Sequence, residues 1–222
     1  MKIYKIPKEL KAIIFDIDST LYTNAKYAFE QVDVQVRYYA SLHNMTNEEA
    51  RNLVSDYRKK WALDHNGQKI SLGNTLKAFG VPIAESIKWR ETLIEPADFL
   101  TKDEKLIEVI KELDKKFKMI CVTNNPVLPA RKTLEALGIS EYIKDIIGLD
   151  TCGVSKPAIE PYKLAVEKCG CKAENCISIG DRYDIDLALP LEMGMGAIEV
   201  AGVTDVYQLV KVFSCFFESS TV

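Results

Sequence analysis

Residues 12–21, AIIFDIDSTL, decide the fold expected of this chain. Apolar residues run without alternation up to Phe15, a pattern typical of a parallel strand that helices cover on both faces. Two carboxylates, Asp16 and Asp18, follow this run directly. We therefore expect a parallel β-strand over residues 12–18 that ends in acidic side chains, and ligands of open α/β sheets bind at this end of the strands.

Four more short runs, rich in apolar and β-branched residues, are expected strands: residues 118–124, 145–149, 176–181 and 196–200. Helical spacing of apolar residues lies between them, at residues 103–117, 128–137 and 160–169. The last two end at Gly138 and Gly170, and glycine commonly terminates helices. This alternation predicts an α/β fold with a doubly wound parallel sheet.

One long segment, from Leu21 to about residue 95, interrupts the alternation and contains no convincing strand. It contains expected helices at residues 25–42, 47–64, 72–79 and 84–92, the second opening with the capping-box pattern TNEE at residues 46–49. We expect a core domain of residues 1–21 and 96–222 and an inserted α-helical domain of residues 22–95, with hinges near 22–24 and 94–96.

Composition excludes several classes of protein. The 222 residues are 47% hydrophobic, which is enough for a sizeable core, and carry a net charge of −3. This balance offers no basic excess for binding nucleic acid. No apolar run approaches the roughly 20 residues of a membrane helix, and the N-terminal run is too short for a signal peptide. We expect a cytoplasmic protein that binds neither nucleic acid nor membrane.

Six cysteines are present, and in a cytosolic chain we expect them to be thiols. Cys169, Cys171 and Cys176 leave open a soft-metal cluster. A structural zinc site usually needs a fourth ligand, and neither histidine of the chain lies near.

The acids of the first strand suggest covalent catalysis. The Asp16 carboxylate can attack phosphorus, and Asp18 can protonate the leaving oxygen and then deprotonate a water molecule. A solvated turn with helix-capping acids remains the alternative.

Three later segments follow expected strands or lie in connecting loops. Thr123 and Asn124 can hold a phosphoryl oxygen, although such a pair is more often a helix cap. Lys156 can neutralise a phosphoryl group, although lysine is a common surface residue. Asp181 and Asp186, after Gly180, offer oxygen ligands to Mg²⁺, or else stabilise a helix N-terminus.

Together the four segments resemble the haloacid dehalogenase-like hydrolase superfamily, whose core is a Rossmann-like sheet. The resemblance covers about residues 10–21 and 96–210. The family motifs match Asp16, Asp18 and Thr20; Thr123; Lys156; and Gly180, Asp181 and Asp186. Ser19 departs from the commoner glycine or asparagine of the first motif.

The resemblance implies a role for each matching residue. It implies a catalytic pair, with Asp16 as nucleophile and Asp18 as general acid and base. It implies a Mg²⁺ cofactor held by Asp16, the Asp18 backbone carbonyl, Asp181 and Asp186, the last directly or through water. Thr123, Asn124 and Lys156 are the expected phosphate-binding residues, and Asp184 is a doubtful candidate.

The position of the insert implies a helical cap of the family's first class, and the motifs look most like the branch containing pyrimidine 5′-nucleotidases. The expected substrate is a small phosphorylated metabolite, a nucleotide or a sugar phosphate. Candidate specificity residues are Tyr22, Asn24 and Asn66. The aromatic residues Tyr38, Tyr39 and Trp61 are expected to pack between helices rather than to stack on a base.

Other functions stay open on this scaffold. A phosphomutase would keep both acids, whereas a dehalogenase would not need Asp18. A non-catalytic binding module would not need the intact polar set. The sequence also leaves open whether the protein is a monomer or a homodimer.

Overall fold

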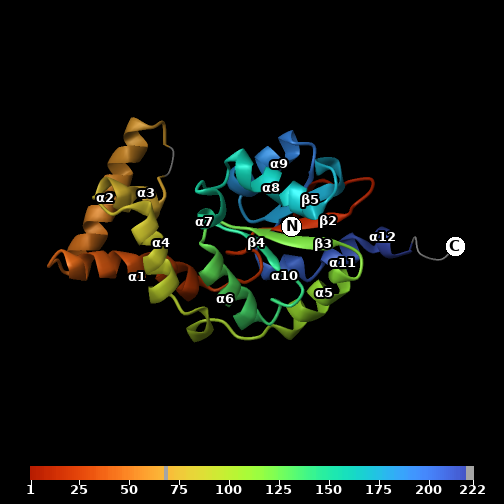
Figure 1. Ribbon diagram of the computed structural model, residues 1–222, viewed down its shortest axis with the longest axis horizontal. Helices are drawn as coiled ribbons and strands as arrows, with labels where there is room; N and C mark the ends of the chain where they lie inside the picture. Colours follow the sequence, from red (N-terminus) through yellow and green to blue (C-terminus); the bar gives the residue numbers. More distant parts are fainter. Residues whose placement is uncertain (68–69, 219–222) are drawn as a thin grey trace. The chain divides into compact units, whose positions relative to one another are not determined.

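The computed structural model describes residues 1–67 and 70–218. The chain divides into two compact units (Figure 1). The first consists of Met1–Asn24 and Pro96–Val222, and the second of Ala25–Glu95. The helical segment is therefore one continuous insertion between two parts of the sheet-containing unit.

The first unit is built on a six-stranded sheet with the order β1-β6-β5-β2-β3-β4. Its strands are β1 (Lys2–Lys5), β2 (Ala12–Phe15), β3 (Lys118–Val122), β4 (Asp145–Ile147), β5 (Cys176–Gly180) and β6 (Gly196–Glu199). All pairings are parallel except that of β1 with β6. The predicted α/β fold with a doubly wound, mostly parallel sheet is confirmed.

The five expected strands are present, but each ends earlier than the apolar pattern indicates. β2 ends at Phe15 instead of residue 18, and β4 ends at Ile147 because Leu149 already begins helix α7 (Leu149–Cys152). The polar residues follow directly after the strands, and the amides of Asp16 and Thr123 still donate to the Ile179 and Ile147 carbonyls at 2.8 and 2.9 Å. They lie on connecting segments, where successive side chains need not point to opposite faces as they do in a strand.

The first strand, β1, was missed by the sequence pattern. Three of its four residues are exposed, so it carries no buried apolar face that would mark it. It pairs with β6 at the edge of the sheet, and lysines are common on such edge strands because they oppose further pairing.

Helices cover both faces of the sheet, as Figure 1 shows: α8 and α9 lie on one side, and α5, α6, α10 and α11 on the other. The bounds are α5 (Glu104–Asp114), α6 (Val127–Leu137), α8 (Ile159–Cys169), α9 (Ala188–Glu192), α10 (Val203–Val206) and α11 (Leu209–Val212). On the α8 side, Tyr162 and Ala165 pack onto Ile14, Ile120 and Cys176. Burial on both faces explains why β2, β3 and β5 are mostly apolar, with Lys118 and Ser178 as the polar exceptions.

Short elements complete this unit. They are the 3₁₀ turns η1 (Pro96–Asp98) and η2 (Ala173–Asn175), the π-helical turn η3 (Tyr183–Leu187) and α12 (Ser214–Glu218). Asp103 caps α5 by accepting a hydrogen bond from the Leu106 amide at 2.9 Å. Gly138 ends α6 with φ of 80°, a left-handed conformation that favours glycine.

The second unit is entirely helical in its described residues, with α1 (Ala25–Leu42), α2 (Asn47–Asp64), α3 (Leu72–Ala78) and α4 (Ile83–Leu93). The expected capping box is present, since the Thr46 hydroxyl accepts from the Glu49 amide and the Glu49 carboxylate accepts from the Thr46 amide. Asp33, almost fully buried, accepts hydrogen bonds from Arg37 and Arg51 and so ties α1 to α2.

The aromatic residues of this unit pack against neighbouring side chains. Tyr39 belongs to the buried core, Tyr38 meets Trp89 edge to face, and Trp61 stacks on His65 of its own helix end. Asn66 lies in an exposed turn with φ of 53°.

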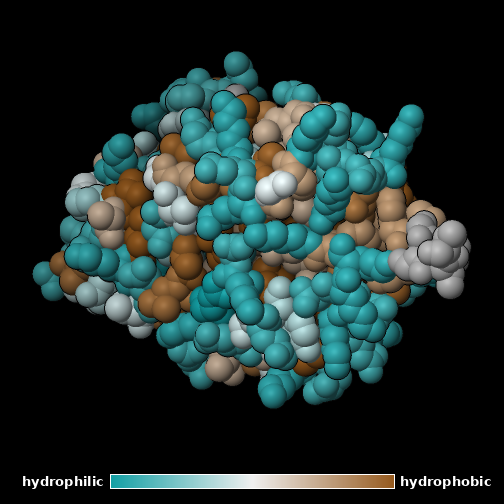
Figure 2. All heavy atoms as spheres, turned by 45° about the vertical axis from the view of Figure 1, so that its right-hand side comes forward, coloured by the Kyte–Doolittle hydropathy of each residue, from teal (hydrophilic) through white to brown (hydrophobic). Residues whose placement is uncertain are grey.

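Among the described residues, no helix has both the length and the apolar character needed to span a bilayer. Hydrophilic residues cover most of the face drawn in Figure 2, and hydrophobic residues lie between them in small groups.

Candidate active site

The predicted polar residues lie where the central strands end. Phe15, the last residue of β2, pairs with Cys121 of β3 on one side and with Ile179 of β5 on the other. Asp16, Thr123 and Asp181 therefore leave the sheet at nearly the same level. The parallel register thus brings the motif residues of distant segments to one edge.

Lys156 is the charged centre of this edge. Its Nζ atom donates hydrogen bonds to Asp16 Oδ1 and to Asp186 Oδ1, each at 2.6 Å. The three side chains are almost completely buried, with 4%, 5% and 1% of their respective residues exposed. Lys156 is thus not the surface lysine that its residue type alone favours, and its ammonium group lies beside two carboxylates that would otherwise repel each other.

Asp186 is held by contacts on several sides. The Arg182 amide donates to Asp186 Oδ2 at 3.1 Å, and the hydroxyls of Ser178 and Tyr162 donate to the Asp186 carbonyl at 2.8 and 3.2 Å. A Cβ atom at Gly180 would lie 2.4 Å from the Asp186 Cβ, so only glycine permits this approach. The π-helical turn η3 contains Asp186, and such turns are frequent at functional sites.

Asp181 completes an acidic cluster. Oxygen atoms of Asp16, Asp181 and Asp186 lie within 4.8 Å of one another. Asp181 Oδ1 is buried and accepts no hydrogen bond; its nearest cation is Arg182 Nε, at 3.7 Å. Asp184, the doubtful candidate, is exposed and stands outside this cluster.

Asp18 is held by two side chains to which the sequence analysis gave no such role. The Tyr22 hydroxyl donates to Asp18 Oδ1 at 2.5 Å, and Asn125 Nδ2 donates to Asp18 Oδ2 at 2.8 Å. Tyr22 was expected to contact substrate, and Asn125 was overlooked, although it extends the polar run Thr123-Asn124. Both bonds orient the Asp18 carboxylate.

Ser19 directly follows Asp18 and has a φ of 58°. This left-handed conformation is easiest for glycine and is tolerated by asparagine, so serine is a less favourable residue at this position.

The remaining predicted residues have partners of their own. Thr123 is buried, and its hydroxyl accepts from the Asn125 amide at 3.1 Å. Asn124 Oδ1 accepts from the Lys156 amide at 2.7 Å, so Asn124 positions the segment that carries Lys156. Asn24 donates to the Phe99 carbonyl at 2.8 Å.

Burial and neighbouring charges shift the ionisation of the cluster. Burial raises the pKa of Asp16 to about 7; Lys156 opposes this shift, and Asp186 and Asp18 add to it. Burial, followed by the charge of Asp186, also raises the pKa of Asp181. Burial alone would lower the pKa of Lys156, but Asp16 and Asp186 outweigh it, so that pKa is raised and the side chain is a cation. The single positive charge of Lys156 thus cannot neutralise the three carboxylates of Asp16, Asp181 and Asp186.

Comparison with known proteins finds phosphatases that resemble this chain in sequence. The chain is 26% identical over 201 residues to glyceraldehyde 3-phosphate phosphatase of Methanothermobacter thermautotrophicus, covering 86% of this chain and 85% of that protein. It is 23% identical over 216 residues to 5-amino-6-(5-phospho-D-ribitylamino)uracil phosphatase YigB of Escherichia coli, covering 89% and 86%.

Solved structures share the fold. The HAD phosphatase of Thermococcus onnurineus superposes with a TM-score of 0.62 at 18% identity, covering 92% of this chain and 98% of that one. A magnesium-bound putative HAD hydrolase, YfnB of Bacillus subtilis, gives 0.59 at 18% identity, covering 91% and 99%. The haloacid dehalogenase-like hydrolase family model matches residues 10–194, and the chain belongs to that family.

Proposed function

We propose that this protein is a Mg²⁺-dependent phosphatase that hydrolyses a small-molecule phosphomonoester through an aspartyl-phosphate at Asp16. The observation that carries the proposal is the contact of the buried Lys156 ammonium with Asp16 Oδ1, at 2.6 Å, inside a cluster of carboxylates. A carboxylate that attacks an anionic phosphate needs nearby positive charge, and this arrangement provides it.

The acidic cluster fits a divalent cation. Asp181 Oδ1 is buried without a hydrogen-bond donor, and carboxylate oxygen is the ligand that Mg²⁺ prefers. Asp16, Asp181 and Asp186 would hold the ion with their side chains, and Asp18 with its backbone carbonyl. When bound, Mg²⁺ supplies the positive charge that draws the phosphate to the carboxylates and stabilises charge on the transferring group.

The reaction then divides between the two acids. Asp16 attacks phosphorus, and Asp18 gives its proton to the leaving alcohol oxygen. Asp18 next takes a proton from a water molecule, which attacks the phosphorus and releases Asp16 and phosphate. Tyr22 and Asn125 hold Asp18 in position for both transfers. Thr123 and Lys156 are the proposed phosphate-binding residues, with Asn124 supporting Lys156.

The proposed substrates are small sugar or nucleotide phosphates. Two relatives are named for phosphorylated compounds of this size, glyceraldehyde 3-phosphate and a phosphoribitylamino-uracil. The helical unit Ala25–Glu95 enters the chain just after the first motif, and we assign it the role of a cap that selects the substrate.

Phosphate release from a panel of phosphomonoesters, with and without Mg²⁺, tests the proposal. The panel should contain both compounds named above, phosphoglycolate and several nucleoside monophosphates. We expect Mg²⁺-dependent release that is lost in Asp16→Asn. A folded protein that releases no phosphate from any compound would contradict the proposal, and an isomerised phosphoester in place of free phosphate would indicate a mutase.

A further inference from the structure

A group of three cysteines lies at the opposite end of β5 from Asp181. Cys169 is the last residue of α8, Cys171 follows Gly170, and Cys176 is the first residue of β5. The Sγ atoms of Cys171 and Cys176 are 3.4 Å apart. The proposed hydrolysis uses none of these thiols.

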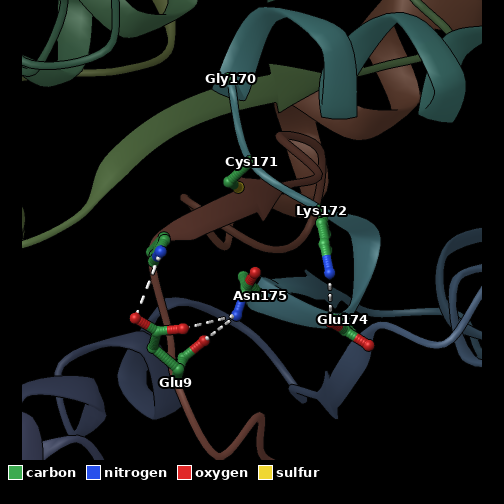
Figure 3. A pocket seen from close by; sticks show the side chains of 7 residues that line it. Glu9, Gly170, Cys171, Lys172, Glu174 and Asn175 are labelled. Carbon is green, nitrogen blue, oxygen red and sulfur yellow. Dashed lines mark hydrogen bonds and ion pairs between the residues drawn. The ribbon is translucent and has the colours of Figure 1, made fainter.

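The two sulfur atoms differ in their access to solvent. Cys176 is fully buried, whereas Cys171 is half-buried and lines a surface depression of about 410 Å³. Figure 3 shows the Cys171 side chain on the segment leaving Gly170, in the same depression as Lys172 and Asn175. A small reagent can therefore reach Cys171 first, with Cys176 directly behind it.

The arrangement suits a pair of thiols better than a metal ion. In the described part of the chain, Asp16, Asp181 and Asp186 each offer a possible metal ligand within 4.8 Å of the other two. The three cysteines do not bring their sulfur atoms this close to one another. Two sulfur atoms already in contact need only a short approach to reach the bond length of about 2.05 Å in a disulfide.

We propose that Cys171 and Cys176 are a modification site that forms a reversible disulfide by exchange with a low-molecular-weight disulfide such as oxidised glutathione. Cys171 loses its proton and attacks one sulfur of the reagent, whose S–S bond breaks to release one thiol. Cys176 then loses its proton and attacks the Cys171 sulfur, releasing the second thiol. Two protein thiols are oxidised and one reagent disulfide is reduced to two thiols.

The three thiols of this segment differ in acidity. The hydrogen bond from Cys176 lowers the pKa of Cys169 against the effect of burial, and Lys118 adds to the lowering. The same bond to Cys169, together with burial and the contact with Cys171, raises the pKa of Cys176. Burial raises the pKa of the Cys171 thiol as well, so the contact between the Cys171 and Cys176 sulfur atoms, not their acidity, favours the bond.

Tryptic mapping tests the proposal, because trypsin cuts after Lys168, Lys172 and Arg182. The full chain is incubated with oxidised glutathione, remaining thiols are alkylated, and the protein is digested without reduction. We expect the peptides 169–172 and 173–182 to remain joined, with a mass two hydrogens below the sum of the two reduced peptides. Dithiothreitol should separate them.

Two variants within the same peptide identify the partner of Cys176. Cys171→Ser should abolish the link, whereas Cys169→Ser should retain it. Circular dichroism and thermal melting establish that each variant is folded.

Two outcomes would overturn the proposal. The first is a link that survives Cys171→Ser and disappears in Cys169→Ser, which would assign the bond to the other cysteine. The second is wild-type protein in which Cys171 and Cys176 carry only mixed disulfides with glutathione, or stay reduced, while the exposed Cys215 reacts. Because the readout is a mass, the result is independent of phosphatase activity.

Discussion

Lys156 donates a hydrogen bond to Asp16 across 2.6 Å, and the two residues are only 4% and 5% exposed. A buried ion pair is costly to form, since both charges leave water, and it is weak evidence for stability alone. The pair lies at the edge of the sheet, beside Asp181 and Asp186. The proposed function explains this position, because Asp16 must be an anion in order to attack phosphorus.

Replacement of Asp16 by asparagine should reduce phosphate release by at least about a thousand-fold, because a carboxamide of the same size is a poor nucleophile. The measurement is the steady-state rate, with mass spectrometry of the trapped phosphoenzyme. Asp184→Asn is the matched control, since it removes an exposed acid from a nearby segment and should leave the rate unchanged. Comparable rates for wild type and Asp16→Asn would rule out Asp16 as the nucleophile.

Replacement of Lys156 by methionine should lower the free energy of unfolding by about 3–5 kcal/mol, because two buried carboxylates lose their common cation. Urea denaturation measures the change. Lys163→Met removes an exposed lysine from α8 and serves as the control. Equal stability of the two variants would mean that Lys156 does not offset this repulsion.

Addition of Mg²⁺ should raise the thermal midpoint of the wild-type protein, because an ion bound only by the folded state stabilises it by about 2.7 kcal/mol at one hundred times its dissociation constant. Asp181→Asn should remove most of this shift, since it deletes one ligand of the cluster. Asp184→Asn should keep the shift. Calorimetric titration with Mg²⁺ provides an independent measure, and unchanged binding by Asp181→Asn would exclude Asp181 as a ligand.

Removal of the Tyr22 hydroxyl in Tyr22→Phe, or of the Asn125 amide in Asn125→Ala, should lower kcat by roughly ten-fold with little change in KM. Each substitution deletes one hydrogen bond to Asp18. The double variant should be less than additive if both bonds orient the same carboxylate. An effect on KM alone would instead indicate that these side chains contact substrate.

Replacement of Asp33 by asparagine should destabilise the helical unit at neutral pH by about 1–3 kcal/mol, since the bonds from Arg37 and Arg51 lose their charge. The hydrogen bond from Arg51 is the largest cause that lowers the pKa of Asp33 below its ordinary value of 3.8. The folded state therefore binds fewer protons, and the stabilisation is complete above pH 3.8 and disappears as the pH falls through the lower, folded pKa. Denaturation of both proteins from pH 7 downward should show the difference shrinking; a constant difference would contradict this account.

The strands and most helices could be predicted from local patterns. Continuous apolar runs such as residues 12–15 need burial on both faces, and capping residues such as Thr46 and Gly138 mark helix ends. The edge strand β1 could not, because Lys2–Lys5 carries no buried face. The π-helical turn Tyr183–Leu187 could not, because contacts from Ser178 and Tyr162 hold its backbone.

The candidate site, too, could be predicted only in part from the sequence. Acidic residues directly after apolar strands predict a cluster, since parallel strands end at a common edge. Two of the partners of those acids are too far away in sequence for any local spacing to indicate them: Asn125 lies 107 positions from Asp18, and Lys156 lies 140 from Asp16.

Residue type and periodicity alone therefore specify the five strands other than β1, the helical insertion and the acids that follow the strands, because these depend on local burial and backbone conformation. Tertiary structure decides which carboxylate contacts Lys156 and which side chains hold Asp18. It also decides that Cys171 touches Cys176. The contacts of Lys156 and Asn125 require the register of the sheet to bring distant segments within hydrogen-bonding distance, and register depends on which face of each strand is buried. The contact of Cys171 depends on the fold of the short segment between α8 and β5.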